Sequence, residues 1–230
     1  MNKLITLGCS LTHNQGVKEK LAELLGYELV NLSQSACGNG LQVNRFQEHV
    51  LQNKIDKNDI IIWQVTTPVR NAVRLFPNEK NYYEIKKLQD EEFTPKDRYH
   101  FVQDSFNAFD NISRLDMLCN SPWSKVYTLE YFDMLEQLQN VLSNIVLCSK
   151  IYPKTLVVFG WYEMMNEHEH NVFKNYLDTH NVHYIKEYYL DWVISKGLKM
   201  WDNDKHPDEE AGSEWSKQVL FPKLQELNWV

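Results

Sequence analysis

The sequence predicts an α/β fold, a three-layer α/β/α sandwich with a central parallel sheet of about five strands. Short apolar stretches alternate with segments of helical periodicity over most of the chain, which is the pattern of such a fold. The stretch at residues 59–65 is apolar almost throughout, as expected for a parallel strand covered on both faces. Small and polar residues follow several of these stretches, where open α/β sheets bind their ligands.

The elements can be placed from these patterns. The expected strands span residues 4–7, 27–32, 59–65, 155–160 and 182–185. The expected helices span residues 15–26, 41–51, 130–150, 166–180 and 208–227. In the first helix, Val17 and Leu21 lie on one stripe and Gly26 stands at the C-cap position. In the second helix, Phe46 and Val50 face inward.

The second half of the chain repeats the same order with stronger helical signals. Residues 130–150 have the clearest amphipathic pattern of the chain, including Leu135, Leu142 and Ile145. The next helix carries Phe173 among its apolar residues, and the last helix carries Trp215. We therefore expect a single domain over residues 1–230 with the sheet at its centre.

Residues 71–129 interrupt this rhythm. They are rich in aromatic and charged residues and have weak periodicity. We interpret them as a mainly helical or irregular insertion. It is either a lid over a binding site or an excursion that packs on the sheet edge.

Composition and charge exclude several classes of function. The net charge of −7 argues against nucleic-acid or anionic-membrane partners. No apolar run approaches the roughly 20 residues needed to cross a bilayer, and the amino terminus leads straight into a strand. The 4 cysteines are widely spaced, so we expect a reduced cytoplasmic protein without disulfides.

Three segments should meet at one rim of the sheet, because the carboxyl ends of parallel strands share an edge. These are the Gly8-Cys9-Ser10 turn, the loop at residues 33–39 and the segment 66–70. A serine hydroxyl becomes a nucleophile when a histidine takes its proton and a third group orients that histidine. His206, just before the last helix, is the best histidine, and Asp204 or Asp202 could orient it.

These motifs resemble those of the SGNH (GDSL-type) hydrolases. Gly8-Cys9-Ser10-Leu11 is similar to the first block, residues 31–39 to the second, and Asp202 to Pro207 to the last. The resemblance implies an SGNH-hydrolase (flavodoxin-like) sandwich and an esterase activity that needs no cofactor. It also implies Ser10 as nucleophile, His206 as general base and Gly38 as an oxyanion-hole donor.

The sequence departs from the family pattern at several positions. Cys9 replaces the usual aspartate, and either Ala36 or Gly38 could occupy the glycine position of the second block, with Asn39 as a nearby side-chain donor. The third block, Gly-x-Asn-Asp, is absent, which leaves Thr66 or Thr67 as a weaker oxyanion donor. Position 203, three before the histidine, is asparagine, so Asp204 or Asp202 must complete a triad.

The expected function is hydrolysis of small esters through an acyl-Ser10 intermediate, with an O-acetylated carbohydrate as a candidate substrate. Arg70, Trp63 and Thr67 are expected to contact that substrate, although Arg70 could equally pair with a carboxylate. A catalytically weak or inactive protein that binds a ligand or protein partner through the rim and the insertion is the alternative. A nucleophile elbow of the α/β-hydrolase type fits less well, because Thr12 stands where it needs glycine.

Two further interpretations were weighed. Cys9 could be a thiol nucleophile, but a small buried residue is its expected role. The four histidines at positions 168, 170, 180 and 183 lack the spacing of a structural zinc site, so we expect no metal and solvated histidines. The sequence leaves the oligomeric state open.

Overall fold

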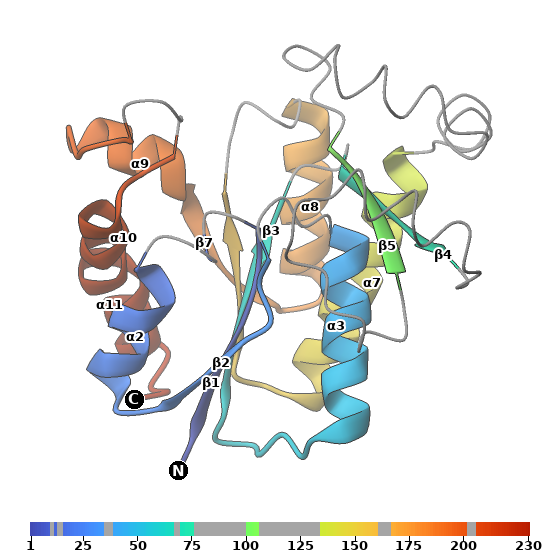
Figure 1. Cartoon of the computed structure of the whole chain (residues 1–230), viewed down its shortest axis with the longest axis horizontal. Coiled ribbons are helices and arrows are strands. Elements are labelled where there is room, and N and C mark those ends of the chain that lie inside the picture. The colour runs from blue at the N-terminus through green and yellow to red at the C-terminus, as the bar shows by residue number, and fades with distance from the viewer. Residues whose placement is uncertain are drawn as a thin grey trace.

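The structure is a computed structural model of the 230-residue chain. It describes residues 1–9, 12, 16–34, 39–66, 70–75, 100–105, 134–160, 167–201 and 206–230. A five-stranded sheet lies at the centre, and its neighbouring strands pair in parallel in the order β2-β1-β3-β6-β7 (Figure 1). The strands are β1 (Lys3–Leu7), β2 (Glu28–Asn31), β3 (Ile60–Val65), β6 (Thr155–Phe159) and β7 (His183–Tyr188). The predicted parallel sheet is confirmed.

Helices cover both faces of the sheet and make the outer layers of the sandwich (Figure 1). On one face lie α2 (Val17–Leu25), α9 (Tyr189–Ser195), α10 (Glu209–Trp215) and α11 (Phe221–Glu226). On the other face lie α3 (Asn39–Gln52), α7 (Met134–Ile151) and α8 (Glu167–Thr179). None of the helices in these described ranges is long and apolar enough to span a bilayer.

Alternating side chains of the strands form the two cores. Leu4 and Ile62 face α2 and α10, whereas Ile5 and Trp63 face α3 and α7. This alternation follows from the two-residue repeat of a strand, and it requires apolar residues at every position of a doubly covered strand. β3 meets that requirement with all six of its residues buried.

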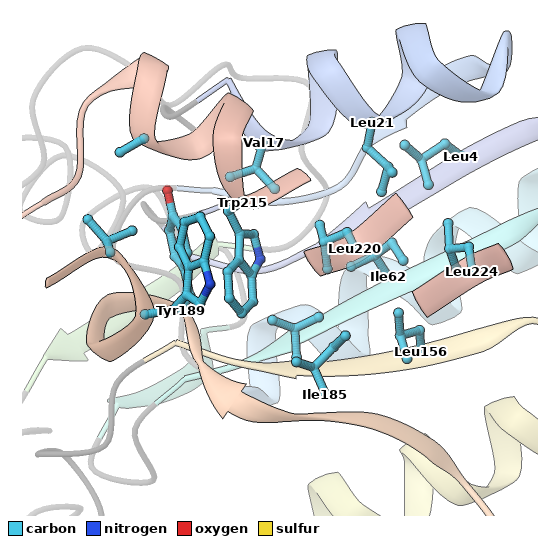
Figure 2. Packing of buried hydrophobic residues seen from close by; sticks show 14 of the residues in the cluster. Leu4, Val17, Leu21, Ile62, Leu156, Ile185, Tyr189, Trp215, Leu220 and Leu224 are labelled. Carbon is cyan, nitrogen blue, oxygen red and sulfur yellow. The ribbon is translucent and has the colours of Figure 1, made fainter. Parts of the chain in front are cut away.

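The first core brings the start of α2 against the C-terminal helices. Val17 and Leu21 of α2 lie beside Trp215, Leu220 and Leu224, while Tyr189 of α9 packs against the Trp215 ring (Figure 2). The ring centroids of Tyr189 and Trp215 are 5.3 Å apart. Such large buried rings contribute strongly to a core. This packing holds the two ends of the chain together.

Several elements differ from the sequence-based expectation. β7 continues to Tyr188, and α9, which the sequence analysis did not predict, follows it directly. The single helix expected near the C-terminus is divided by a π-helical segment, η1 (Ser216–Leu220). Pro222 follows this segment at the start of α11. Because proline has no N–H to donate to the preceding turn, the helical bonding is interrupted there.

An antiparallel strand pair lies within the expected insertion. β4 (Arg70–Leu75) pairs with β5 (His100–Ser105), with Arg70 opposite Ser105 and Leu75 opposite His100. β4 runs close to α3. The expectation of helical or irregular structure is therefore wrong for these two stretches, because cross-strand pairing overrides weak local periodicity. Residues 76–99 and 106–133 lie outside the described residues.

Asp208 caps α10, and its side chain accepts a hydrogen bond from the Ala211 N–H at 2.9 Å. We expect Asp208→Ala to lower the free energy of unfolding by about 1 kcal/mol, because a backbone donor in the first turn loses its acceptor. Urea denaturation measures this change. Asp208→Asn retains the acceptor and should stay near wild type, and an equal loss in both variants would contradict a capping role.

Candidate functional site

The turn after β1 is held in place by short-range and long-range hydrogen bonds. The Thr12 N–H donates to the Cys9 carbonyl at 3.0 Å, which joins the two residues that flank positions 10 and 11. Gln64 of β3 accepts from the Thr12 hydroxyl at 2.6 Å and from the Cys9 N–H at 3.3 Å. Ser10 itself lies outside the described residues. Cys9 before it and Thr12 after it are nevertheless bonded to the neighbouring strand, Cys9 through its N–H and Thr12 through its hydroxyl.

Gly8 allows this turn to approach β3 closely. A Cβ added at position 8 would stand 2.6 Å from the Gln64 Oε1 atom and 2.6 Å from the Thr12 Oγ1 atom. Real Cβ atoms do not approach other heavy atoms that closely. Glycine is therefore required here for packing.

The Cys9 side chain points into the protein. Cys9 is fully buried, and its Sγ atom lies 3.7 Å from the Gln64 Oε1 atom. A buried thiol that has no basic group bonded to it among the described residues is expected to be a small core residue rather than a nucleophile. The structure thus favours the packing role that the sequence analysis expected for Cys9.

The loop after β2 runs along the same end of the sheet. The Gln34 N–H donates to the Gly8 carbonyl at 3.1 Å, and the Leu32 N–H donates to the Thr6 carbonyl at 2.9 Å. The Asn31 side chain accepts bonds from the Ser33 N–H and the Ser33 hydroxyl. These bonds place the second loop beside the first turn. Gly38 and Ala36 lie outside the described residues.

Asn39 joins the start of α3 to the end of β3. Its amide group donates to the Thr66 carbonyl at 2.8 Å and accepts from the Thr66 N–H at 2.9 Å. The Asn39 side chain therefore clamps a strand end. The Thr66 hydroxyl is buried and has no hydrogen-bond partner among the described residues, so it remains a candidate donor. Thr67 lies outside the described residues.

His206 lies two residues before Asp208, the N-cap of α10. The Trp201 N–H donates to the His206 carbonyl at 2.9 Å, and Met200 forms an antiparallel bridge with Pro207. The His206 side chain is half-buried. Asp202 and Asp204, the expected orienting carboxylates, lie outside the described residues.

Two helices that follow positions 10 and 206 in the chain, α2 and α10, are in contact. A Cβ at Gly16 would stand 2.9 Å from the Glu209 carbonyl oxygen, and Gly16 has a φ of 65°, which favours glycine. The Ser216 hydroxyl donates to the Val17 carbonyl at 2.7 Å. Position 10 precedes Gly16 by a few residues, and position 206 precedes Glu209 by a few. The helices that follow positions 10 and 206 in the chain thus pack together on one face of the sheet.

Tyr189 adds a buried hydroxyl to this side. Burial raises the pKa of the Tyr189 hydroxyl far above its usual value, and the Asp208 carboxylate raises that pKa further. A phenol with such a pKa stays protonated near neutral pH and does not serve as a base. Tyr189 and Gln64 both line a small cavity of about 10 Å³. It is too small for a substrate.

The expected substrate contact by Trp63 is wrong in this structure. Trp63 is fully buried and packs against Phe46 of α3, with ring centroids 5.4 Å apart. Position 63 points into the core because side chains alternate along β3. Arg70 begins β4, and the structure does not describe its side chain.

One of the four histidines is not solvated as expected. His170 of α8 is buried and hydrogen-bonds to the Tyr188 hydroxyl. It thus packs inside the α8 layer beside β7, because the longer β7 strand brings Tyr188 to it.

Sequence reasoning missed two buried polar residues, one of which, Gln64, supports the turn after β1. Gln64 was counted within an apolar run, although a glutamine inside a buried strand is itself the signal that could have found it. Gln42, in the first turns of α3, is fully buried, and neither polar atom of its amide has a partner among the described residues. Buried polar side chains usually have partners, and exceptions often mark functional sites.

Comparison with protein-family models and with curated protein sequences finds no match. Solved structures of similar fold include the psychrotrophic esterase EstA from Pseudoalteromonas sp., at 12% identity and a TM-score of 0.54, covering 99% of this chain and 100% of that chain. TesA matches at 13% identity and a TM-score of 0.53, covering 98% of this chain and 99% of the other.

A third similar structure is a lipolytic protein of the G-D-S-L family from Veillonella parvula DSM 2008. It matches at 11% identity and a TM-score of 0.50, covering 96% of this chain and 97% of the other. At such low identity the agreement concerns the course of the backbone over almost the whole chain. The chain has the fold of the SGNH (GDSL-type) hydrolases.

Proposed function

We propose that the protein is a serine hydrolase that cleaves small carboxylic esters through an acyl-Ser10 intermediate. The observation that carries this proposal is that Cys9 and Thr12, which flank position 10, are both bonded to Gln64, while α2, which follows position 10, packs against α10, which follows His206. The SGNH-hydrolase fold supports it, as do the esterase and lipolytic descriptions of proteins that share that fold.

The chemistry follows from the groups at the rim. His206 takes the proton of the Ser10 hydroxyl as the Oγ atom attacks the ester carbonyl carbon, and Asp204 or Asp202 orients the imidazole. The tetrahedral intermediate collapses, the alcohol leaves with the proton from His206, and the acyl group stays on Ser10. Water, deprotonated by His206, then attacks the acyl-enzyme and releases the carboxylic acid.

The oxyanion would be stabilised by backbone and hydroxyl donors. The Gly38 N–H is the family-based donor, and the Thr66 hydroxyl is a further candidate because its buried oxygen has no partner among the described residues. The Asn39 amide is engaged with the Thr66 backbone, so its main contribution is to hold Thr66 in place. A site with a hydroxyl in place of the usual asparagine should be slower, because each oxyanion donor is worth about 2.7–4 kcal/mol.

The proposed substrate is a small ester, with an O-acetylated carbohydrate as the first candidate. Arg70 and Thr67 follow the end of β3 in sequence and would contact the polar part of such a substrate. No cofactor, metal or nucleic acid enters the proposed reaction.

Fluorophosphonate labelling tests the proposal directly. The reagent phosphonylates a serine only when its hydroxyl is activated, and the structure of EstA was solved inhibited by monoethylphosphonate. We expect stoichiometric labelling, with the adduct on the peptide that contains Ser10 in mass spectrometry. Protein denatured beforehand is the control and should not react. An unlabelled, folded protein would contradict the proposal.

A non-catalytic protein of the same fold is the second candidate. The missing third-block asparagine favours it, because the hydroxyl of Thr66 is a weaker replacement. Such a protein would bind a ligand or protein partner through the rim and the insertion. Failure of labelling together with an intact fold by circular dichroism would support this alternative.

A further inference from the structure

Gln64 is a polar side chain near the carboxyl end of the central strand, β3. It is only 2% exposed, and its neighbours along β3 are apolar. Its Oε1 atom accepts hydrogen bonds from the Thr12 hydroxyl at 2.6 Å and from the Cys9 N–H at 3.3 Å, and the Cys9 thiol lies 3.7 Å away. One oxygen atom thus holds three donors of the same turn.

These donors lie on either side of Ser10 in the chain. Cys9 immediately precedes Ser10 in the chain, and Thr12 follows Ser10 by two residues; both are hydrogen-bonded to Gln64. The Thr12 N–H also donates a hydrogen bond to the Cys9 carbonyl. Because water does not reach these buried groups, no solvent competes for the bonds. The amide of Gln64 is also held in one orientation, since all three turn groups are donors toward its oxygen.

Core stability alone does not account for a glutamine at this position. The Gln64 Nε2 atom is buried and has no partner among the described residues. A buried strand position ordinarily takes an apolar residue, and local violations of this kind concentrate at functional sites. The hydrogen bonds of Gln64 to Cys9 and Thr12 explain a glutamine at this position, whereas burial alone does not.

We propose that Gln64 is a positioning residue for the Ser10 nucleophile. It fixes the turn through Cys9 and Thr12, so that the Ser10 hydroxyl stays aligned with its base and with the ester carbonyl. This inference rests on the proposed function and names a residue outside the expected triad and oxyanion hole. Displacements of about 1 Å at a reacting group can cost roughly 100-fold in rate.

Matched variants separate positioning from stability. Gln64→Met keeps the side-chain volume and removes the hydrogen-bond acceptor. Thr12→Val keeps the side-chain shape and removes the hydroxyl donor, whereas Thr12→Ser retains the hydroxyl. Ile60→Val is the control, because Ile60 is buried on the same face of the same strand but far from the turn. Thermal unfolding confirms that each variant is folded at the assay temperature.

Kinetics with p-nitrophenyl acetate give the first measurement. We expect Gln64→Met and Thr12→Val to lower kcat by about 100-fold with little change in KM, because alignment affects the transition state more than binding. Thr12→Ser, which keeps the hydroxyl, should retain most of the wild-type kcat. The double variant Gln64→Met/Thr12→Val should be no worse than Gln64→Met alone, since Gln64→Met already removes the Thr12 bond together with the Cys9 bonds. Ile60→Val should keep the wild-type kcat.

Amide hydrogen exchange gives a measurement that needs no catalysis. In the wild-type protein, the Cys9 and Thr12 amides should be protected, and Gln64→Met should reduce the protection of Cys9 at least tenfold relative to amides of β3. Wild-type kcat in folded Gln64→Met would overturn the inference. If wild-type protein is neither active nor labelled, the proposed function fails instead. In that case hydrogen exchange still tests whether Gln64 holds the turn. Unchanged protection of the Cys9 amide in Gln64→Met would contradict this role.

Discussion

Ser10→Ala should lower kcat/KM for p-nitrophenyl acetate by at least about 10⁴-fold. Removing the nucleophile of a serine hydrolase removes the covalent pathway, and the remaining groups supply only residual catalysis. The bonds among Cys9, Thr12 and Gln64 should persist, because none of them uses the Ser10 side chain. The variant should therefore fold normally while losing its activity.

Steady-state kinetics and circular dichroism on the same samples check this expectation. Ser149→Ala is a matched control, because its hydroxyl bonds only to the local Val146 carbonyl near the end of α7. It should retain wild-type activity. Equal rates for wild-type protein and Ser10→Ala would eliminate Ser10 as the nucleophile.

Gly8→Ala should lower the free energy of unfolding by about 3 kcal/mol, near the upper end of the cost of overpacking. The new Cβ would stand 2.6 Å from Gln64 Oε1, 2.6 Å from Thr12 Oγ1 and 2.8 Å from Thr12 Cβ. These atoms are buried and bonded to one another, so they cannot move aside without breaking the bond that joins them. Strain and the loss of that bond therefore add.

Urea unfolding measures the effect, and Gly40→Ala is the control. Nothing lies within 4 Å of a Cβ at Gly40, which is in the first turn of α3. Alanine should be neutral there or stabilise the helix by up to about 1 kcal/mol. If Gly8→Ala lowers the free energy of unfolding by less than about 0.5 kcal/mol, the usual range of surface substitutions, the prediction is contradicted. The turn would then be able to move aside for the new Cβ.

The layers of the fold could be predicted because their signals are local. The apolar stretch that became β3 and the helical stripe that became α7 are each readable from neighbouring residues. β4 and β5 could not be found in this way. Their pairing joins Arg70 to Ser105 across a long stretch of chain, and such pairing leaves no local period in the sequence.

The sequence by itself determined the doubly covered parallel sheet, because apolar runs must be buried on both faces. It also determined which segments follow the strand ends, and hence the prediction of Ser10, His206 and the loop between them. Only the tertiary structure decided how the rim is supported. Gln64 meets Thr12, and Asn39 meets Thr66, across more than 25 residues of chain. Hydrogen bonds between distant residues depend on strand register and helix placement, which the order of residue types does not reveal.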